Sequence, residues 1–124
     1  MGLDIFFESK NKENEEVAYF RKVNFLLPYF GYEENCTHIE ITKQQVEDIV
    51  DDCKKLLEIQ QTETNEKFVE KAQEIMPTES GFFFGSTEYD EWYVHDLKEV
   101  LETFSKLLET FDFENDTLLM HCWW

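Results

Sequence analysis

The chain has 124 residues, of which 42% are hydrophobic and 16% aromatic, so it has enough apolar material to fold as a single globular domain over residues 1–124. Its 28 acidic and 11 basic residues give a formal net charge of −17. This charge repels the phosphate groups of DNA and RNA, so we expect no direct binding to nucleic acid.

The cysteines and the opening residues indicate a reducing compartment. The three cysteines are widely spaced and form no Cys-x-x-Cys pair, a pattern that does not fit a disulfide framework. The opening MGLDIFFESK has an acid where a signal peptide is basic, and its apolar run is too short for a signal peptide or a membrane span. We therefore expect a cytoplasmic protein that does not cross a membrane.

The N-terminal third of the chain predicts a strand, a long helix and a second strand. Residues 3–8 are a short apolar run rich in β-forming residues. From Asn14, which suits an N-cap, apolar residues recur at helical spacing until Pro28 and Gly31 end the run. Residues 37–41 alternate between polar and apolar, which predicts a strand with its two isoleucines facing the core. The predicted helix has an apolar face made of Val17, Tyr19, Phe20, Val23, Leu26, Leu27 and Phe30.

The rest of the chain predicts three further helices and a terminal strand. Thr42 and Gln45 have the spacing of a capping box ahead of a helical apolar run. A shorter helix is expected over about 64–76, where Pro77 ends it, and the longest amphipathic run predicts a helix over about 88–111. The C-terminal LLMHCWW is typical of a strand.

This succession of elements predicts an α+β fold. Its order is β-α-β-α-α-(β)-α-β, where the strand in brackets is the phenylalanine run at 82–84. Helices and strands of this kind can share one core if the helices cover one side of the strands. We therefore expect about four helices packed on one face of a small, mostly antiparallel sheet.

The segment GFFFGSTEYDEWY, residues 81–93, is interpreted mainly as the connection between an extended run and the last helix. Its three phenylalanines cannot all face one way in a strand, so at least one points away from the core or is covered by another aromatic residue. We favour core packing of the run over an exposed partner surface. Gly85 is expected to let the backbone turn, and Thr87 to cap the last helix.

Arg21 is expected to lie partly buried beside this segment. Its guanidinium would brace the acidic first turn of the last helix through Glu88 or Asp90. The alternative is a small-ligand site or an enzyme pocket where the GFFFG segment meets the first helix, with the arginine binding a carboxylate or phosphate. The residues of that site would be Arg21, Asn24, Glu88, Asp90 and Trp92.

Several motifs resemble a family of small proteins encoded by bacteriophages and prophages. They are the MGLD start, YFRKVN at 19–24, Met76-Pro77-Thr78 ahead of the GFFFGSTEYDE core at 81–91, and an aromatic C-terminus. Phe20 stands where the family has Trp, and the chain ends His121-Cys122-Trp123-Trp124 where the family has a serine before the final Trp. The family has no established activity, so the resemblance implies the cytosol of a bacterial host and no mechanism.

Three side chains on the predicted strands are candidate metal ligands. His38 and Glu40 share one face of the second strand, and His121 lies in the last one, so the three side chains would converge if those strands were neighbours. This spacing is more typical of a solvated strand face, and we predict no metal and no cofactor. Three residues of the last helix also stack at helical spacing, but opposite its apolar stripe: Glu91, His95 and Glu99.

The sequence contains no catalytic motif that we recognise. Cys53 falls in the apolar stripe of its helix, where a cysteine is a small core residue. Ser80 and Ser86 lack the Gly-x-Ser-x-Gly pattern of a hydrolase. The run from Gly81 to Gly85 does not fit a phosphate loop, because three phenylalanines would block the approach of a phosphate to the backbone.

These observations favour a non-catalytic function in protein binding. We expect an accessory or host-modulating protein whose acidic surface complements a basic partner, such as a nucleic-acid-binding protein of the host. Oligomeric state is left open. The best acidic stripe on a predicted helix comprises Glu47, Asp48, Asp51 and Asp52.

Overall fold

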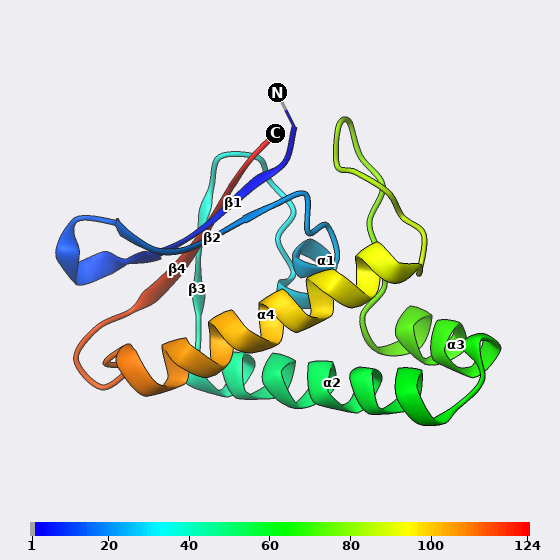
Figure 1. Ribbon diagram of the computed structural model, residues 1–124. Coiled ribbons are helices and arrows are strands. Elements are labelled where there is room, and N and C mark those ends of the chain that lie inside the picture. Colours follow the sequence, from blue (N-terminus) through cyan, green and yellow to red (C-terminus); the bar gives the residue numbers. More distant parts are fainter. Residues whose placement is uncertain (1) are drawn as a thin grey trace.

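The computed structural model describes residues 2–124 and has the α+β fold that the sequence predicts (Figure 1). Within these residues, four strands form one sheet and four α-helices accompany it. The elements in chain order are β1 (Asp4–Ser9), the short 3-10 helix η1 (Lys10–Lys12), β2 (Glu15–Arg21), α1 (Leu26–Phe30), β3 (His38–Ile41), α2 (Lys43–Thr62), α3 (Asn65–Ile75), α4 (Glu91–Thr110) and β4 (Leu118–Trp123).

The sheet has the strand order β2-β1-β4-β3, and every neighbouring pair is antiparallel. β4 is the last element of the chain, yet it lies between β1 and β3, so the C-terminal residues complete the middle of the sheet. The strands predicted at 3–8, at 37–41 and at the C-terminus are confirmed. Both termini consequently lie at the same end of the sheet (Figure 1).

The prediction of a long first helix from Asn14 is wrong, because residues 15–21 form β2. Glu13 and Asn14 have left-handed φ angles of 55° and 61°, and they turn the chain back into a hairpin with β1. Ala18 and Phe20 are buried while the residues between and beside them are exposed, which is the period of a strand. Asn14 is therefore a turn residue and not an N-cap.

Only the end of the predicted first helix is helical. α1 is a single short helix of five residues that carries Leu26 and Leu27 into the core. Gly31 ends it with a left-handed φ of 70° and donates its N–H to carbonyls of the last turn, which is a common use of glycine after a helix. The apolar residues read as one helical face are thus divided between a strand and a short helix.

A cluster of phenylalanines joins the sheet to the helices. Phe7 of β1 contacts Phe104 of α4 edge to face, with ring centroids 4.9 Å apart, and Phe20 of β2 stacks on Phe104 at 5.7 Å. Phe30 of α1 lies 5.9 Å from Phe7. All four are buried, so aromatic packing fixes α4 and α1 against the inner face of the sheet.

The two middle helices begin and end close to where the sequence places them. Thr42 and Gln45 form the expected capping box at the start of α2. Thr64 caps α3, which ends just before Met76 and Pro77. α2 runs beside α4 beneath the sheet in Figure 1, and its buried side chains complete the core: Val46, Ile49, Val50, Cys53 and Leu56.

The last helix begins later than predicted, and the phenylalanine run before it is not a strand. α4 starts at Glu91, and its N-cap is Asp90, whose side chain accepts hydrogen bonds from the backbone N–H groups of Trp92 and Tyr93. Thr87 does not cap it. The prediction failed because Thr87 and Asp90 both suit an N-cap. Asp90 is favoured because its carboxylate accepts two backbone N–H groups and also lies at the positive end of the helix dipole.

The outer face of the sheet has no helix packed on it among residues 2–124. Tyr19 and Trp123 are exposed there, on the side opposite the phenylalanine cluster. Glu8 lies on the same face, yet it is buried. Apolar and acidic side chains thus share a surface that solvent can reach.

Candidate functional site

The most unusual part of the surface is the aromatic loop, which we define as residues 77–90 between α3 and α4. Figure 1 shows it rising as a long excursion beside the end of the sheet where the two termini lie. Its base is tied together by Thr78, which donates to the carbonyl of Thr87 and whose N–H bonds to the hydroxyl of Tyr89. Hydrogen bonds, rather than a strand or helix, therefore fix the course of this loop.

Asn24 fixes the aromatic loop to the body of the protein. Its side-chain amide donates to the carbonyls of Phe84 and Ser86, at 3.2 and 3.0 Å, and its oxygen accepts the N–H of Glu79 at 3.2 Å. Asn24 is only 3% exposed. A buried amide with three such bonds stabilises a particular path of the backbone, which gives Asn24 a structural role.

The tip of the aromatic loop is a tight turn with two phenylalanines at its centre. The N–H of Phe84 bonds to the carbonyl of Gly81, so Phe82 and Phe83 occupy the two central positions. Phe83 has a left-handed φ of 60°, at a position where glycine is usual. A bulky residue there costs about 1–3 kcal/mol, and such strain is most frequent at functional sites.

The three phenylalanines of the run have different surroundings. Phe84 is buried against Trp124, with ring centroids 5.3 Å apart. Phe82 is 74% exposed and Phe83 49% exposed, and their rings contact each other at 4.3 Å. The preference for core packing of this run is therefore wrong for two of the three residues, because the turn points their side chains away from the protein.

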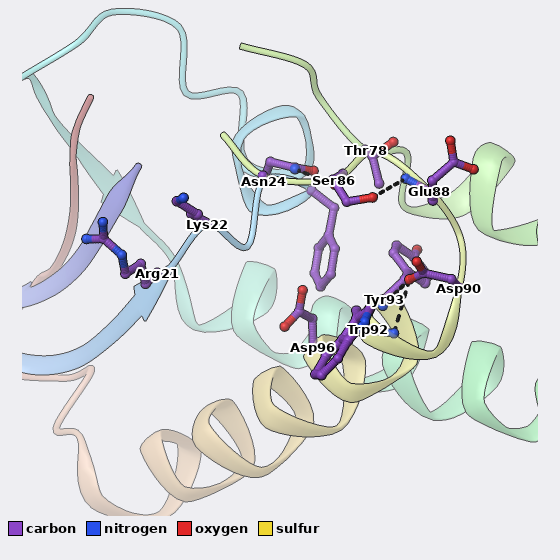
Figure 2. A pocket seen from close by; sticks show the side chains of 12 residues that line it. Arg21, Lys22, Asn24, Thr78, Ser86, Glu88, Asp90, Trp92, Tyr93 and Asp96 are labelled. Carbon is purple, nitrogen blue, oxygen red and sulfur yellow. Dashed lines mark hydrogen bonds between the residues drawn. The ribbon is translucent and has the colours of Figure 1, made fainter. Parts of the chain in front are cut away.

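The five residues proposed for a ligand site all line one cavity of about 250 Å³ beside the aromatic loop. In Figure 2, Arg21 and Lys22 lie on the side of β2, whereas Trp92, Tyr93 and Asp96 lie on α4. Ser86 and Thr78 line the cavity from the aromatic loop. The cavity thus lies between the sheet, the last helix and the loop.

Arg21 does not brace the first turn of α4 as expected. Its guanidinium bonds to Asp4, at 2.8 Å, and the hydroxyl of Tyr19 bonds to the same carboxylate. The side chain of Arg21 is 51% exposed, so it is not partly buried against a helix either. Both corrections have one cause, since residues 15–21 form a strand and Arg21 faces its cross-strand neighbour Asp4.

Three of the five predicted residues are already engaged in the fold, and one of them is Arg21, which is paired with Asp4. Asn24 holds the aromatic loop and Asp90 caps α4. Glu88 and Trp92 are exposed at the rim of the cavity. The side chains left to meet a ligand are thus mainly those of Lys22, Glu88, Trp92 and Asp96.

Asp96 is the most perturbed acid in this cavity. Burial raises the pKa of its carboxyl from 3.8 to about 6, and the nearby negative charge of Glu99 adds to this effect. His95 lies 3.8 Å away and acts in the opposite direction. Sequence reasoning missed Asp96 and Lys22, because the pocket that brings them together depends on the hairpin that was misread as a helix.

The acidic stripe on α2 is only partly a free surface. Glu47 and Asp51 are exposed, whereas Asp52 is half-buried and accepts a hydrogen bond from the hydroxyl of Tyr29 at 2.7 Å. Asp48 is exposed and bonds to Gln44 one turn earlier. Lys54 and Lys55 follow in the same helix, so the stripe is short.

The cysteines do not form a nucleophilic site. Cys53 and Cys122 are buried, and burial raises the pKa of both thiols, which disfavours the reactive thiolate. Cys36 is exposed and carries a left-handed φ of 66°, with its N–H bonded to the carbonyl of Cys122. Its backbone therefore serves to fix the segment before β3 to β4.

Among residues 2–124, two groups of side chains could hold a metal ion. The first consists of Glu8, His38 and His121, and the second of His95, Asp96 and Glu99. The structure brings His38 and His121 together as neighbours in β3 and β4, as the sequence suggested, but the carboxylate beside them belongs to Glu8 rather than Glu40. Glu40 lies instead near Lys10, at 3.8 Å.

No protein family, curated protein or solved structure matches this chain in the comparisons with known proteins. Among residues 2–124, no helix is both long and apolar enough to cross a membrane.

Proposed function

We propose that this protein is a non-catalytic protein-binding module, and that Phe82 and Phe83 are the centre of its contact surface. One observation carries the proposal. The turn at the tip of the aromatic loop holds two adjacent phenylalanines out of the core, although one of them requires a strained left-handed backbone. Within residues 2–124, the packing gives no reason for this cost, whereas a partner that covers both rings would.

The energetics of binding favour this pair as an anchor. Aromatic side chains contribute a large apolar area to an interface and lose few rotatable bonds on binding, and they are enriched among residues that dominate affinity. The turn and the buried Asn24 hold the loop in place before any partner arrives. Such preorganisation reduces the entropy that must be lost on binding.

The charge of the chain indicates the kind of partner. A net charge of −17 gives long-range attraction to a basic protein and accelerates their encounter. Glu47 and Asp51 on α2 are exposed acids that would contribute to this attraction. We infer a basic host protein as partner, with the protein acting as a phage or prophage accessory factor in the cytosol of a bacterial host.

A site-specific cross-linking experiment tests the proposal. A photoreactive phenylalanine analogue is placed at position 82, and in a matched protein at Lys106, an exposed position of α4. Irradiation in a bacterial host lysate should trap a basic protein from position 82 and not from position 106. Excess wild-type protein should abolish this product, whereas excess Phe82→Ser/Phe83→Ser protein should compete poorly.

Salt provides the second part of the test. If charge guides the encounter, the cross-linked product should decrease as the salt concentration rises, because exposed charges are screened. The same products from positions 82 and 106, equal competition by wild type and the double variant, or no product at all would each contradict the proposal.

Small-ligand binding in the adjacent cavity is the second candidate. It is favoured by Asp96, a half-buried carboxyl with a pKa of about 6 in a cavity that Lys22 and Trp92 also line. A small molecule with an amine or hydroxyl group beside an aromatic ring would suit these side chains. In a fragment screen by NMR, ligands of this cavity should shift the amide signals around Asp96 and bind Phe82→Ser/Phe83→Ser protein as well as wild type.

A further inference from the structure

The outer face of the sheet carries a second group of side chains that the proposed function does not use. His38 of β3 lies directly opposite His121 of β4 in the strand register, and their rings are 4.2 Å apart. Glu8 of β1 reaches the same place from the other side of β4. Three strands therefore bring two imidazoles and one carboxylate together.

The distances between these groups are those of ligands that share one ion. The Nε2 atom of His38 lies 3.1 Å from the Oε1 atom of Glu8, and the Nδ1 atom of His121 lies 3.6 Å from its Oε2 atom. Two ligands at about 2.0–2.1 Å from a tetrahedral zinc ion are separated by about 3.3 Å. One ligand atom from each of the three residues lies within 4.8 Å of the others, which is close enough for the three to meet on one ion.

Glu8 supplies an independent observation. It is only 9% exposed, and its Oε1 atom is buried without a hydrogen-bond partner among the described residues. The 3.1 Å approach of His38 to this atom is close enough for a hydrogen bond but does not have the geometry of one. A buried carboxylate oxygen in this state is costly unless a positive charge compensates it.

We propose that Glu8, His38 and His121 bind a divalent transition-metal ion of the zinc class. Two histidines and one carboxylate are an established protein ligand set for zinc, with a fourth position left for water or another ligand. The imidazoles favour zinc over the oxygen-preferring ions magnesium and calcium. The acidic chain as a whole attracts cations to this face.

The surroundings of the cluster favour binding and leave it accessible. Leu119 lies opposite Glu8 in the register and is buried, so an apolar residue shields one side of the carboxylate. On the other side Glu8 and His121 line an open hollow of about 430 Å³ together with Asp4, Phe6 and Trp123. An ion can enter from this hollow and keep an exchangeable fourth ligand toward it.

The competing explanation is that protonated histidines neutralise Glu8 without any metal. The two explanations differ in their response to added ions. A histidine must be neutral to ligate, so zinc binding releases protons and weakens in acid. Protonated histidines paired with Glu8 would give no stoichiometric uptake of zinc.

Titration calorimetry with zinc chloride at neutral pH tests the proposal. Wild-type protein should bind one zinc ion with a micromolar or tighter dissociation constant, and an excess of magnesium should not displace it. His38→Ala and His121→Ala should each weaken binding at least tenfold. His38 is the more informative of the two, because its side chain is 37% exposed and its removal leaves the core intact.

Two variants control for binding elsewhere. His95→Ala alters the second acidic and histidine cluster, and Cys36→Ser removes the exposed thiol, so both should bind zinc within twofold of wild type. Zinc should also raise the melting temperature of wild type and of both control variants, but not of His38→Ala. Absence of binding to wild type, retention of full affinity by His38→Ala and His121→Ala, or loss of affinity in His95→Ala or Cys36→Ser would overturn the proposal.

Discussion

In the centre of the fold, Phe7, Phe20 and Phe104 pack ring against ring and are almost completely buried, whereas Phe82 and Phe83 at the tip of the aromatic loop contact mainly each other and solvent. The same residue type therefore has opposite surroundings in two regions of one small protein. Composition alone cannot separate the two groups, because a buried and an exposed phenylalanine count alike in the aromatic content.

The difference between the regions lies in what holds them. The phenylalanine cluster is held by apolar contact between the sheet and α4, while the aromatic loop is held by the polar side chain of Asn24 and by a tight turn. Because hydrogen bonds and the buried Phe84 fix the loop, the exposed Phe82 and Phe83 are not required for its position. The loop can thus present apolar side chains to a partner at little cost to the core.

The largest effect is expected in the phenylalanine cluster. Phe104→Ala should lower the free energy of unfolding by about 3–5 kcal/mol, because the large cavity left between Phe7 and Phe20 cannot close fully. Urea denaturation followed by circular dichroism measures this change. Phe82→Ala is the matched control and should cost less than about 0.5 kcal/mol, since its side chain is exposed. Similar costs for the two variants would remove the distinction between the regions.

The second effect concerns the polar attachment of the loop. Asn24→Ala should cost about 2–3 kcal/mol, because three backbone groups of the loop, one buried and two partly buried, lose their partner. Hydrogen exchange should then increase at Phe84 and Ser86 more than in α2. Exchange that rises equally throughout the protein would mean that Asn24 supports the core rather than the loop.

Much of the fold follows from local patterns in the sequence, with one instructive failure. The capping box at Thr42 and the stop at Pro77 are local signals, and α2 and α3 were placed correctly from them. Residues 15–21 have apolar side chains that fit both a helical and an alternating period. Pairing with β1 decides between them, and that pairing depends on residues distant in sequence, which no local pattern contains.

The candidate sites were less predictable, for the same reason. The five residues of the predicted ligand site do line one cavity, but Arg21 was given the wrong partner because it was placed on a helix. Glu8 could not be connected with His38 and His121, because only the position of β4 between β1 and β3 makes them neighbours. Glu40 has the better local spacing, and yet it lies elsewhere.

The third prediction concerns Asp96, on the wall of the cavity between the two regions. Its folded-state pKa of about 6 exceeds the unfolded value of 3.8, so the folded state holds the proton more tightly. The contribution of Asp96 to the free energy of unfolding is therefore most favourable below about pH 4. This contribution is lost as the pH rises through about 6. Asp96→Asn should stabilise the protein at pH 7 by about 1 kcal/mol, after allowance for partial solvent screening.

The pH dependence provides the check for Asp96. Urea denaturation of wild type and Asp96→Asn should give closely similar unfolding free energies near pH 4 and diverge toward pH 7, with the variant more stable. A constant difference across this range would mean that the substitution acts through packing and not through the titration of the carboxyl group.

The fourth prediction separates stability from binding within the aromatic loop. Phe83→Gly should leave the free energy of unfolding unchanged or raise it by up to about 1 kcal/mol, because glycine adopts a positive φ without strain. The same change removes half of the exposed aromatic pair, so it should greatly reduce the cross-linked product from position 82. Loss of stability in Phe83→Gly would show that this ring supports the fold, and the contrast with the phenylalanine cluster would weaken.

The smallest effect is expected for Arg21, the residue to which the sequence assigned the largest structural role. Its bond to Asp4 joins an arginine side chain that is 51% exposed to an aspartate side chain that is 25% exposed, and ion pairs that solvent reaches contribute little to stability because solvent screens them. Arg21→Ala should therefore leave the melting temperature close to that of wild type, in contrast to Asn24→Ala, which removes a neighbouring residue of the same cavity. Arg21→Lys serves as the control, because it keeps the charge and loses the planar guanidinium. The opposite outcome would be a large drop in melting temperature for Arg21→Ala that Arg21→Lys only partly restores. It would mean that the aromatic loop depends on a charged contact of Arg21 as well as on Asn24.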